Sequence, residues 1–381
     1  MANYEVLIIG GGVIGLSIAR GLHRLGARQI AVVDRGRPGR EASWAAAGML
    51  APNAENEEID DLYRFCDESR QLFPELAGEL LEETGINIEL DRTGTLYAAF
   101  SDEDLEHIDE RFELQKAAGI SVNSLSAAEI LNAEPAMSPD VRGSLYFPDD
   151  WQVENRKLVT ALIKYAVDSG IEIIEERPVE SLIVDSGTVK GAVAGDGSLL
   201  ADVTVLATGA WTSLIKIAGK DLPFTVKPIR GQMISYKPVV RSFRHVVYSP
   251  RGYLVPRTDG RILMGATVED VGFDDTTTVD AVRQLCEAAV EIAPFLSSEP
   301  VADHWAGLRP YATGGMPVIG TIPGVDRLVV ATAHFRNGIL LTPITAKVIA
   351  EFIVTGKRSR YMGLFGPGPE SSSGRELNAI A

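Results

Sequence analysis

The stretch YEVLIIGGGVIGLSIARGLHRLGARQIAVVD, residues 4–34, decides the fold of this chain. A short apolar run, Val6–Ile9, leads directly into a cluster of glycines. Apolar residues then recur at helical spacing as far as Gly26, a residue typical of the position just after a helix. A second apolar run ends at Asp34. This order of strand, glycine turn, helix and strand predicts the opening unit of an α/β domain.

The glycines between the first strand and the helix have the spacing G-x-G-x-x-G, at Gly10, Gly12 and Gly15. The first permits a tight turn, the second lets the backbone approach a pyrophosphate, and the third allows close packing of helix on strand. The helix N-terminus offers unpaired N–H groups to the phosphates. Asp34 can accept a hydrogen bond from a ribose hydroxyl, which predicts a dinucleotide and disfavours NADP but leaves NAD and FAD open. A glycine turn without a ligand is the alternative.

The composition is that of an ordinary globular protein: 381 residues, 45% hydrophobic and 23% charged, enough for two domains. The net charge of -16 argues against binding to nucleic acid or to a membrane surface. No segment approaches the roughly 18 apolar residues of a membrane helix. With two cysteines, Cys66 and Cys286, and no signal peptide, we expect a cytoplasmic protein. Five scattered histidines predict no metal site.

The rest of the chain alternates between strand and helix patterns. We expect a hairpin over residues 86–100, a strand meander over 180–209 with a turn at Asp196–Gly197, a hairpin over 252–267 with its tip at Asp259–Gly260, a helix over 279–293, a strand over 327–333 and a helix over 341–355. The last strand and helix are expected to return to the first half of the chain.

Two segments favour FAD over NAD. REASWAAAGML, residues 40–50, is a loop of small residues that would let the chain lie flat along an extended cofactor, with the Ser43 hydroxyl facing phosphate or isoalloxazine edges. ATGAW, residues 207–211, ends a strand in a glycine beside the expected nucleotide site. The alternative for the first segment is an ordinary packed helix start.

With these segments on view, the chain resembles the D-amino acid oxidase family of FAD enzymes, and within it the glycine oxidase subgroup of the thiamine pathway. The resemblance rests on IIGGGVIG (8–15), Asp34, SWAAAGML (43–50), ATGAW (207–211), PIRGQ (228–232), GYLVPR (252–257), HWAGLRP (304–310) and HFRNGILLTP (334–343). These motifs run from the N-terminus to the last helix.

The resemblance implies an α/β fold, α+β overall, with a Rossmann-like FAD-binding domain and a substrate domain built on a mixed, largely antiparallel sheet. We expect the FAD-binding domain to comprise residues 1–80, 150–215 and 305–363, the substrate domain residues 81–149 and 216–304, and a flexible tail residues 364–381.

The resemblance also implies that FAD is bound non-covalently, since residues 307–320 lack the cysteine through which sarcosine-oxidising relatives often attach it. FAD contacts are expected at Gly10, Gly12, Val13, Ile14, Gly15, Asp34, Arg35, Ala42, Ser43, Ala47, Gly48, Met49, Val179, Gly209, His334, Phe335, Arg336, Asn337, Gly338, Ile339 and Leu340.

For the substrate, the resemblance makes Arg309 a carboxylate clamp, because a guanidinium presents two parallel N–H donors to a carboxylate. Tyr253 would hydrogen-bond the same carboxylate, Arg336 would be a second contact, and Met49 and Val268 would line the small pocket. From the residues alone, Arg309 could instead pair with a nearby acid, and Arg336 could hold the loop or the flavin. Tyr253, Met49 and Val268 could simply be core residues.

The implied reaction is oxidation of glycine, with sarcosine and small D-amino acids as further candidates, by hydride transfer from Cα to the flavin. The products would be an imine or glyoxylate, ammonia and hydrogen peroxide, with molecular oxygen as acceptor and a role in thiamine thiazole synthesis. The side chains need only position the substrate and exclude water, so no obligatory acid or base is expected. We expect His304 and His334 to be structural, and the protein to be a homotetramer.

Three other functions stay open at this point. The chain could be a D-amino acid or sarcosine oxidase or dehydrogenase with another substrate, including one that passes electrons to quinone. It could be a simple NAD dehydrogenase, which residues 40–50 and 207–211 disfavour. It could also be a non-catalytic flavin-binding subunit, which Arg309 and Tyr253 disfavour.

Overall fold

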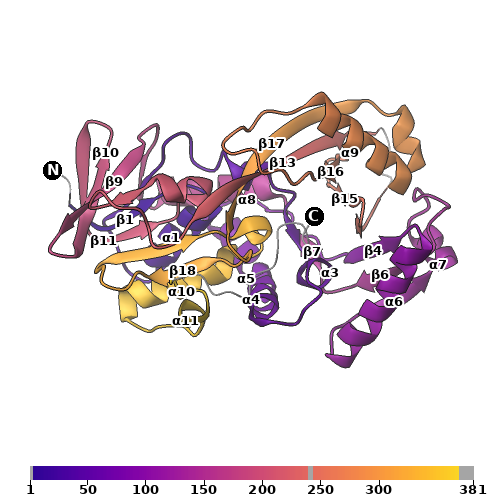
Figure 1. Ribbon diagram of the computed structural model, residues 1–381, viewed down its shortest axis with the longest axis horizontal. Helices are drawn as coiled ribbons and strands as arrows, with labels where there is room; N and C mark the ends of the chain where they lie inside the picture. The colour runs from indigo at the N-terminus through magenta and orange to yellow at the C-terminus, as the bar shows by residue number, and fades with distance from the viewer. Residues whose placement is uncertain (1–2, 239–242, 369–381) are drawn as a thin grey trace.

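The computed structural model describes residues 3–238 and 243–368, and within them the strands form two large sheets (Figure 1). The first sheet contains β12 (Lys216–Ile217), β9 (Val179–Asp185), β10 (Thr188–Ala194), β11 (Gly197–Leu206), β1 (Asn3–Ile9), β2 (Ile30–Val33) and β8 (Glu172–Ile174) in spatial order, with β19 (Leu328–Thr332) and β18 (Val318–Thr321) branching from β11. Its β8–β2–β1–β11–β19 part is parallel. The predicted opening unit and the predicted meander of β9, β10 and β11 are both confirmed.

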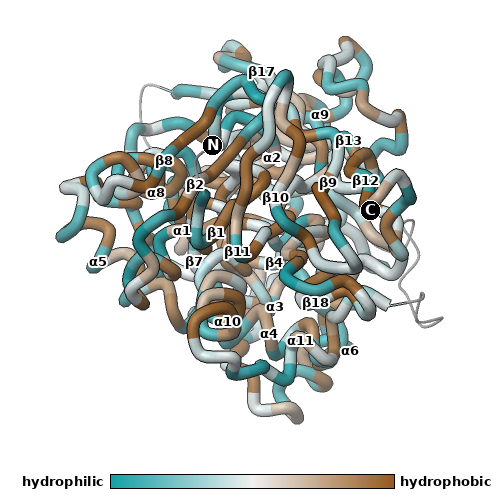
Figure 2. The backbone as a smooth tube through the Cα atoms, turned by 90° about the vertical axis from the view of Figure 1, so that its left-hand side faces the viewer, coloured by the Kyte–Doolittle hydropathy of each residue, from teal (hydrophilic) through white to brown (hydrophobic). Residues whose placement is uncertain are grey.

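The first sheet is buried on both faces because the side chains of β1 alternate between two cores. Val6 and Ile8 join the helical core, while Leu7 and Ile9 pack with residues of the meander. Helix α1 (Val13–Arg24) packs against α10 (Thr342–Thr355) and α8 (Asn155–Asp168). Figure 2 shows the hydrophobic stretches gathered along β1 and β2 in the middle of the molecule.

The second sheet is largely antiparallel, as predicted. Its spatial order is β17 (Val301–Ala312), β13 (Val226–Tyr236), β16 (Ile262–Gly265), β15 (Gly252–Pro256), β14 (Val246–Ser249), β4 (Thr95–Ala99), β6 (Gly143–Phe147) and β5 (Asn123–Ser126). Only the β14–β4 pair among these is parallel. The predicted hairpin of β15 and β16 is confirmed. The expected domain boundary after residue 304 falls inside β17, whose full length pairs with β13.

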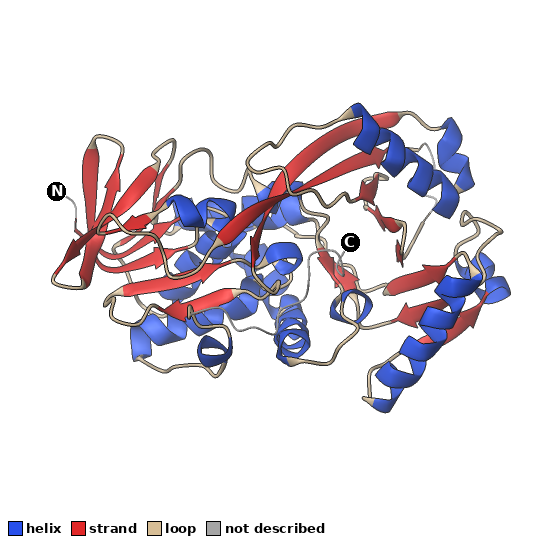
Figure 3. Cartoon of the chain, in the orientation of Figure 1, coloured by secondary structure: helices blue, strands red, loops and turns tan. Residues whose placement is uncertain are grey.

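The other elements surround and connect the two sheets (Figure 3). They are α2 (Ala42–Ala45), β3 (Met49–Leu50), α3 (Pro52–Glu55), α4 (Asp61–Gln71), α5 (Phe73–Thr84), α6 (Asp102–Ala117), α7 (Ala127–Ala133), β7 (Trp151–Gln152), α9 (Val279–Ile292), α11 (Tyr361–Leu364) and the short 3-10 helices η1 (Gly209–Leu214), η2 (Pro294–Ser298) and η3 (Phe335–Asn337). The small β3–β7 pair lies apart from both sheets. Among the described residues, no helix has the length and apolar character needed to cross a bilayer.

The predicted hairpin over residues 86–100 is wrong. Its second half is β4, but β4 pairs with β6 and β14, and residues 86–90 form no strand. Glu89 has a positive φ of 54°, which breaks the extended run, and Ile88 is buried in the helical core. The alternation of apolar and polar residues over 86–90 therefore reflects packing against the helical core and not pairing with a neighbouring strand.

Part of the expected flexible tail, residues 369–381, lies outside the described residues. Within the described part, Phe365 is buried and its ring lies 5.2 Å from that of Phe65 on α4.

The glycine turn gives the first testable prediction. A Cβ added at Gly15 would lie 2.0 Å from the Gly10 carbonyl oxygen, a backbone atom that cannot move aside cheaply. We expect Gly15→Ala to lower the free energy of unfolding by about 3 kcal/mol. In the matched helical control, Gly78→Ala, a Cβ meets nothing within 4 Å, so this variant should gain about 1 kcal/mol. Denaturant unfolding measures both; equal midpoints would contradict the prediction.

Candidate active site

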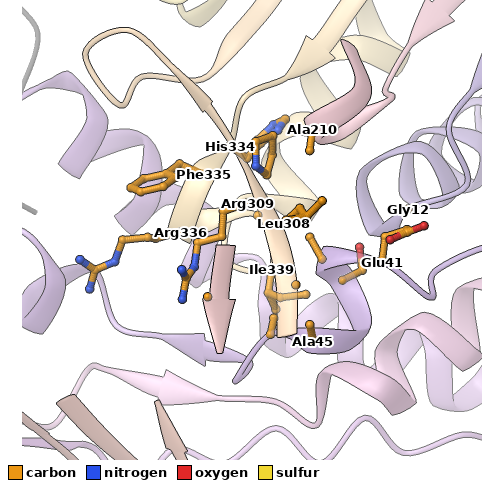
Figure 4. Close-up of a pocket in the computed structure, with 18 of the residues that line it drawn as sticks. Gly12, Glu41, Ala45, Ala210, Leu308, Arg309, His334, Phe335, Arg336 and Ile339 are labelled. Atoms are coloured by element: carbon orange, nitrogen blue, oxygen red, sulfur yellow. The ribbon is translucent and has the colours of Figure 1, made fainter. Parts of the chain in front are cut away.

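A continuous cavity of about 890 Å³ runs from the glycine turn after β1 to Arg309 on β17. Its size is within the range of small-molecule sites. In Figure 4, Gly12 and Glu41 lie on one side of the view, and the guanidinium groups of Arg309 and Arg336 lie on the other. One end of the cavity therefore has the glycine turn typical of a nucleotide site, and the other end carries two arginines.

The glycine turn makes the first end of the cavity accessible to a ligand backbone. Gly10 has a φ of +106°, and an added Cβ would lie 2.3 Å from the Ala207 carbonyl oxygen. No side chain caps the N-terminus of α1, but the Val13 N–H donates to Ser43 Oγ at 3.0 Å. Gly12 leaves its side of the cavity open, which suits close approach of a phosphate.

Asp34 has a structural role at this end in addition to lining the cavity. Its two carboxylate oxygens accept hydrogen bonds from the Gly11 N–H at 2.7 Å and the Gly36 N–H at 2.9 Å. The carboxylate thus holds the glycine turn against the end of β2. Next to it, the exposed Arg35 guanidinium lies over the Trp211 ring, 3.8 Å from its centroid, and the two form a flat wall of the cavity.

A loop lines the middle of the cavity, and two buried polar side chains, Arg257 and Asn155, hold this loop in place. Arg257 donates to the carbonyl oxygens of Ala47 at 2.6 Å and Val153 at 2.8 Å. Asn155 donates to the carbonyl oxygen of Ser43 at 2.9 Å. Burial lowers the pKa of Arg257 to about 10, so it stays charged at neutral pH. Gly48 completes the loop with a φ of +71°.

At the cationic end, Arg309 lies across the flat surface of Gly231 on the neighbouring strand. A Cβ at Gly231 would be 2.1 Å from Arg309 Nη1, so glycine there leaves the room that the guanidinium occupies. Nη1 donates to the Thr267 carbonyl oxygen at 3.0 Å. Within the described residues, no carboxylate forms an ion pair with Arg309. Burial lowers its pKa, and Tyr253 opposes the shift by charge and a hydrogen bond.

Tyrosine rings from neighbouring strands surround the two arginines. The ring centroids of Tyr253 and Tyr248 are 6.1 Å apart in a stacked pair, and Arg336 donates to the Tyr248 hydroxyl at 2.5 Å. Burial raises the pKa of Tyr253, so its hydroxyl is a donor at neutral pH. Burial alone would lower the pKa of Arg336, but Tyr248 and Glu55 outweigh it and raise the pKa. Both arginines are therefore permanent cations.

The structure brings most of the predicted site residues to the wall of this cavity. They are Gly10, Gly12, Val13, Ile14, Asp34, Arg35, Ala42, Ser43, Ala47, Gly48, Met49, Val179, Gly209, Tyr253, Val268, Arg309, His334, Phe335, Arg336, Gly338 and Ile339. Gly15, Asn337 and Leu340 do not line it. Gly15 packs under Gly10, Asn337 hydrogen-bonds along the backbone turn to His334, and Leu340 is buried in the helical core.

Neither histidine of the two key segments is placed for acid–base work. His334 lines the cavity, but burial lowers its pKa to about 3 and its Nε2 lies 3.1 Å from Thr345 Oγ1. His304 is exposed and its Nδ1 lies 2.9 Å from Thr277 Oγ1. Neither Cys66 nor Cys286 lines the cavity. The described part of the chain has no cluster of metal-ligating side chains.

Sequence reasoning missed several polar residues that build the site. Arg257 is the last residue of GYLVPR, and its basic character at the end of an apolar strand was the available signal. Glu55 lines the cavity beside the two arginines. Asp150 and Arg111 hold the helix that carries Glu55. Their pattern in the sequence is that of ordinary acids and bases.

Comparison with known proteins adds to this geometry. Residues 5–352 match the family model described as FAD dependent oxidoreductase. This chain belongs to the FAD-dependent oxidoreductase family. The glycine oxidase of Pseudomonas putida is 34% identical over 97% of this chain and 99% of its own. The crystal structure of glycine oxidase from Geobacillus kaustophilus superposes with a TM-score of 0.92, at 31% identity over 98% of this chain and 100% of that one.

A further relative, the bifunctional protein ThiO/ThiG of Trichormus variabilis, is 36% identical over 95% of this chain. The chain spans only 54% of the length of that protein.

The cavity fits FAD, the cofactor of the family. The glycine turn, the N-terminus of α1 and the Ser43 side chain beside it suit a pyrophosphate, whereas Asp34 and the Arg35–Trp211 wall suit the adenosine part. The segment from Ala42 to Gly48, which is the short helix α2 followed by a loop of small residues, leaves the remaining length of the cavity open as far as the arginines.

The contact between Arg309 and Gly231 gives the second prediction. Gly231→Ala keeps an ordinary backbone conformation but puts its Cβ where Arg309 Nη1 now lies. We expect binding of acetate, followed by the absorbance change of bound FAD, to weaken roughly 10–100-fold, the loss of one charge-assisted hydrogen bond. FAD content should not change. Gly363→Ala, where a Cβ meets nothing within 4 Å, is the control. Unchanged acetate affinity in Gly231→Ala would contradict the assigned role.

Proposed function

We propose that this protein is an FAD-dependent oxidase of glycine, with sarcosine and small D-amino acids as further substrates. The observation that carries the proposal is Arg309, a half-buried guanidinium that faces the cavity with no described carboxylate partner. A buried cation without a counter-charge is costly, so a substrate carboxylate completes the site. The matches with glycine oxidases over nearly the full length support this choice of substrate.

The residues of the chain act by binding and orientation. Arg309 takes the two oxygens of the substrate carboxylate, and the protonated Tyr253 hydroxyl donates to the same group. Met49 and Val268 limit the space around Cα, which favours glycine over bulkier amino acids. A neutral amine nitrogen then assists loss of hydride from Cα by donating its lone pair. FAD, when bound, supplies the hydride acceptor and passes the electrons to oxygen.

The overall reaction converts glycine, oxygen and water to glyoxylate, ammonia and hydrogen peroxide. The imine formed first is hydrolysed, or is consumed in thiamine thiazole synthesis, a role supported by the match with the bifunctional protein ThiO/ThiG. Non-covalent attachment of FAD is supported by the absence of cysteine from the described cavity wall. A cytoplasmic homotetramer completes the proposal, and light scattering tests the assembly.

Anaerobic mixing of the FAD-loaded protein with glycine, sarcosine and D-alanine in turn tests the substrate. We expect glycine to bleach the flavin absorbance rapidly, and air to restore it with release of hydrogen peroxide. Bleaching only by a bulkier D-amino acid would keep the mechanism but overturn the substrate. Bleaching by none of them would support a non-catalytic flavin-binding subunit instead.

Substitution of Arg309 tests the carboxylate clamp. Removing one partner of a buried charge pair costs about 3–5 kcal/mol, so Arg309→Ala should lower kcat/KM for glycine by roughly 10²–10⁴-fold. Arg309→Lys keeps the charge without the fork geometry and should recover part of the loss. FAD content is the control for folding. Glycine oxidation at the original rate in Arg309→Ala would remove the basis of the proposal.

A further inference from the structure

Glu55 stands on a helix that is fixed from both sides. The Asp150 carboxylate accepts from the Asn53 N–H at 3.1 Å, the Asn53 Nδ2 at 2.8 Å and the Ala54 N–H at 2.8 Å. On the other side, Arg111 Nη2 donates to the carbonyl oxygens of Asn53 at 2.6 Å and Ala54 at 2.8 Å. All four of these residues are buried. These buried contacts hold the backbone of α3 in one position, and this fixes the position of Glu55 at its end.

The side chain of Glu55 faces the cavity and shares it with the two arginines. In residues 3–238 and 243–368, no donor is recorded within hydrogen-bond distance of its carboxylate, and no cation forms an ion pair with it. Burial raises its pKa, whereas the charges of Arg336 and Arg309 stabilise the ionised form. A half-buried carboxylate that faces a cavity in this way is completed by a cationic ligand group.

The cavity thus holds a cation and an anion that each lack a bound partner of opposite charge, Arg309 and Glu55. An amino acid is a matching zwitterion, because its carboxylate and ammonium groups are separated by Cα alone. The ammonium form has no lone pair with which to assist hydride loss, so it must first lose a proton. Arg309 accounts for the carboxylate, which leaves the ammonium without an assigned partner.

We propose that Glu55 binds the ammonium group of the substrate and accepts a proton from it, which delivers the neutral amine required for oxidation. One N–H bond of the ammonium breaks, an O–H bond forms on the Glu55 carboxylate, and the electron pair stays on nitrogen. No oxidant or reductant takes part in this step. The inference rests on the proposed function. It adds a proton-accepting group in contact with the substrate to the residues that position it.

The pH dependence follows from this role. The carboxylate accepts a proton only when it is ionised, so kcat/KM for glycine should rise with pH through the pKa of Glu55, which burial raises above the usual value. The charged and titratable groups that line this part of the cavity are Arg309 on β17, Arg336 in η3, Tyr253 on β15, Tyr248 on β14, Arg251 between β14 and β15, Glu57 and Glu58 after α3, Tyr97 on β4, and His107 and Arg111 on α6.

The test compares Glu55→Gln with the unaltered FAD-loaded protein. We expect kcat/KM for glycine to fall roughly 10²-fold, in the range for loss of a proton acceptor, and its rise with pH to disappear. Inhibition by glycolate, which has the carboxylate but no amine, should not weaken. Glu55→Asp should recover part of the activity together with the rise. Glu75→Gln is the control, because Glu75 is exposed on α5 and does not line the cavity.

Two results would overturn the inference alone: glycine oxidation at the original rate in Glu55→Gln, or equal weakening of glycine and glycolate, which a purely structural role would produce. Failure of the unaltered protein to oxidise glycine would overturn the proposed function and this inference together. FAD content and thermal stability of each variant identify a folding defect, and in that case the pH profile of Glu55→Asp decides the question.

Discussion

The positive charge of Arg309 is the constraint on which the site depends. The guanidinium is enclosed by protein except toward the cavity, and the described chain offers it a carbonyl oxygen and a tyrosine hydroxyl but no carboxylate ion pair. Three features of the second sheet follow from it. Gly231 leaves the space in which the guanidinium lies, Thr267 turns its carbonyl oxygen toward it, and Tyr253 stands next to it on β15.

A second buried guanidinium connects this end of the cavity to the nucleotide end. Arg257 donates to carbonyl and amide oxygens of Ala47, Gln152, Val153 and Asn155, and the nearby charge of Glu154 also stabilises it. These partners lie in the loop of small residues, in β7 and at the start of α8. The strand pair that carries Tyr253 is therefore bound to the loop that lies along the cofactor, which keeps the two ends of the cavity in a fixed relation.

Local patterns predicted the fold well. The glycine turn, the meander and the β15–β16 hairpin each depend on residues close together in the sequence, and each is present. The hairpin over residues 86–100 was wrong because alternation alone does not distinguish a strand from a segment that buries every second side chain in a helical core.

The site divides in the same way. Most of the residues predicted to contact FAD or substrate lie in short sequence motifs, and these motifs can be recognised without knowledge of the fold. The supporting contacts join residues far apart: Asp150 binds Asn53 across 97 positions, and Arg257 binds Ala47 across 210. No local pattern records such pairs, and the role of Glu55 depends on them.

The most direct test of the account is a crystal structure of the FAD-loaded protein with glycolate. We predict that the glycolate carboxylate lies against the Arg309 guanidinium within hydrogen-bond distance of the Tyr253 hydroxyl. An ion pair between Arg309 and Glu55, with glycolate bound elsewhere in the cavity, would contradict the account.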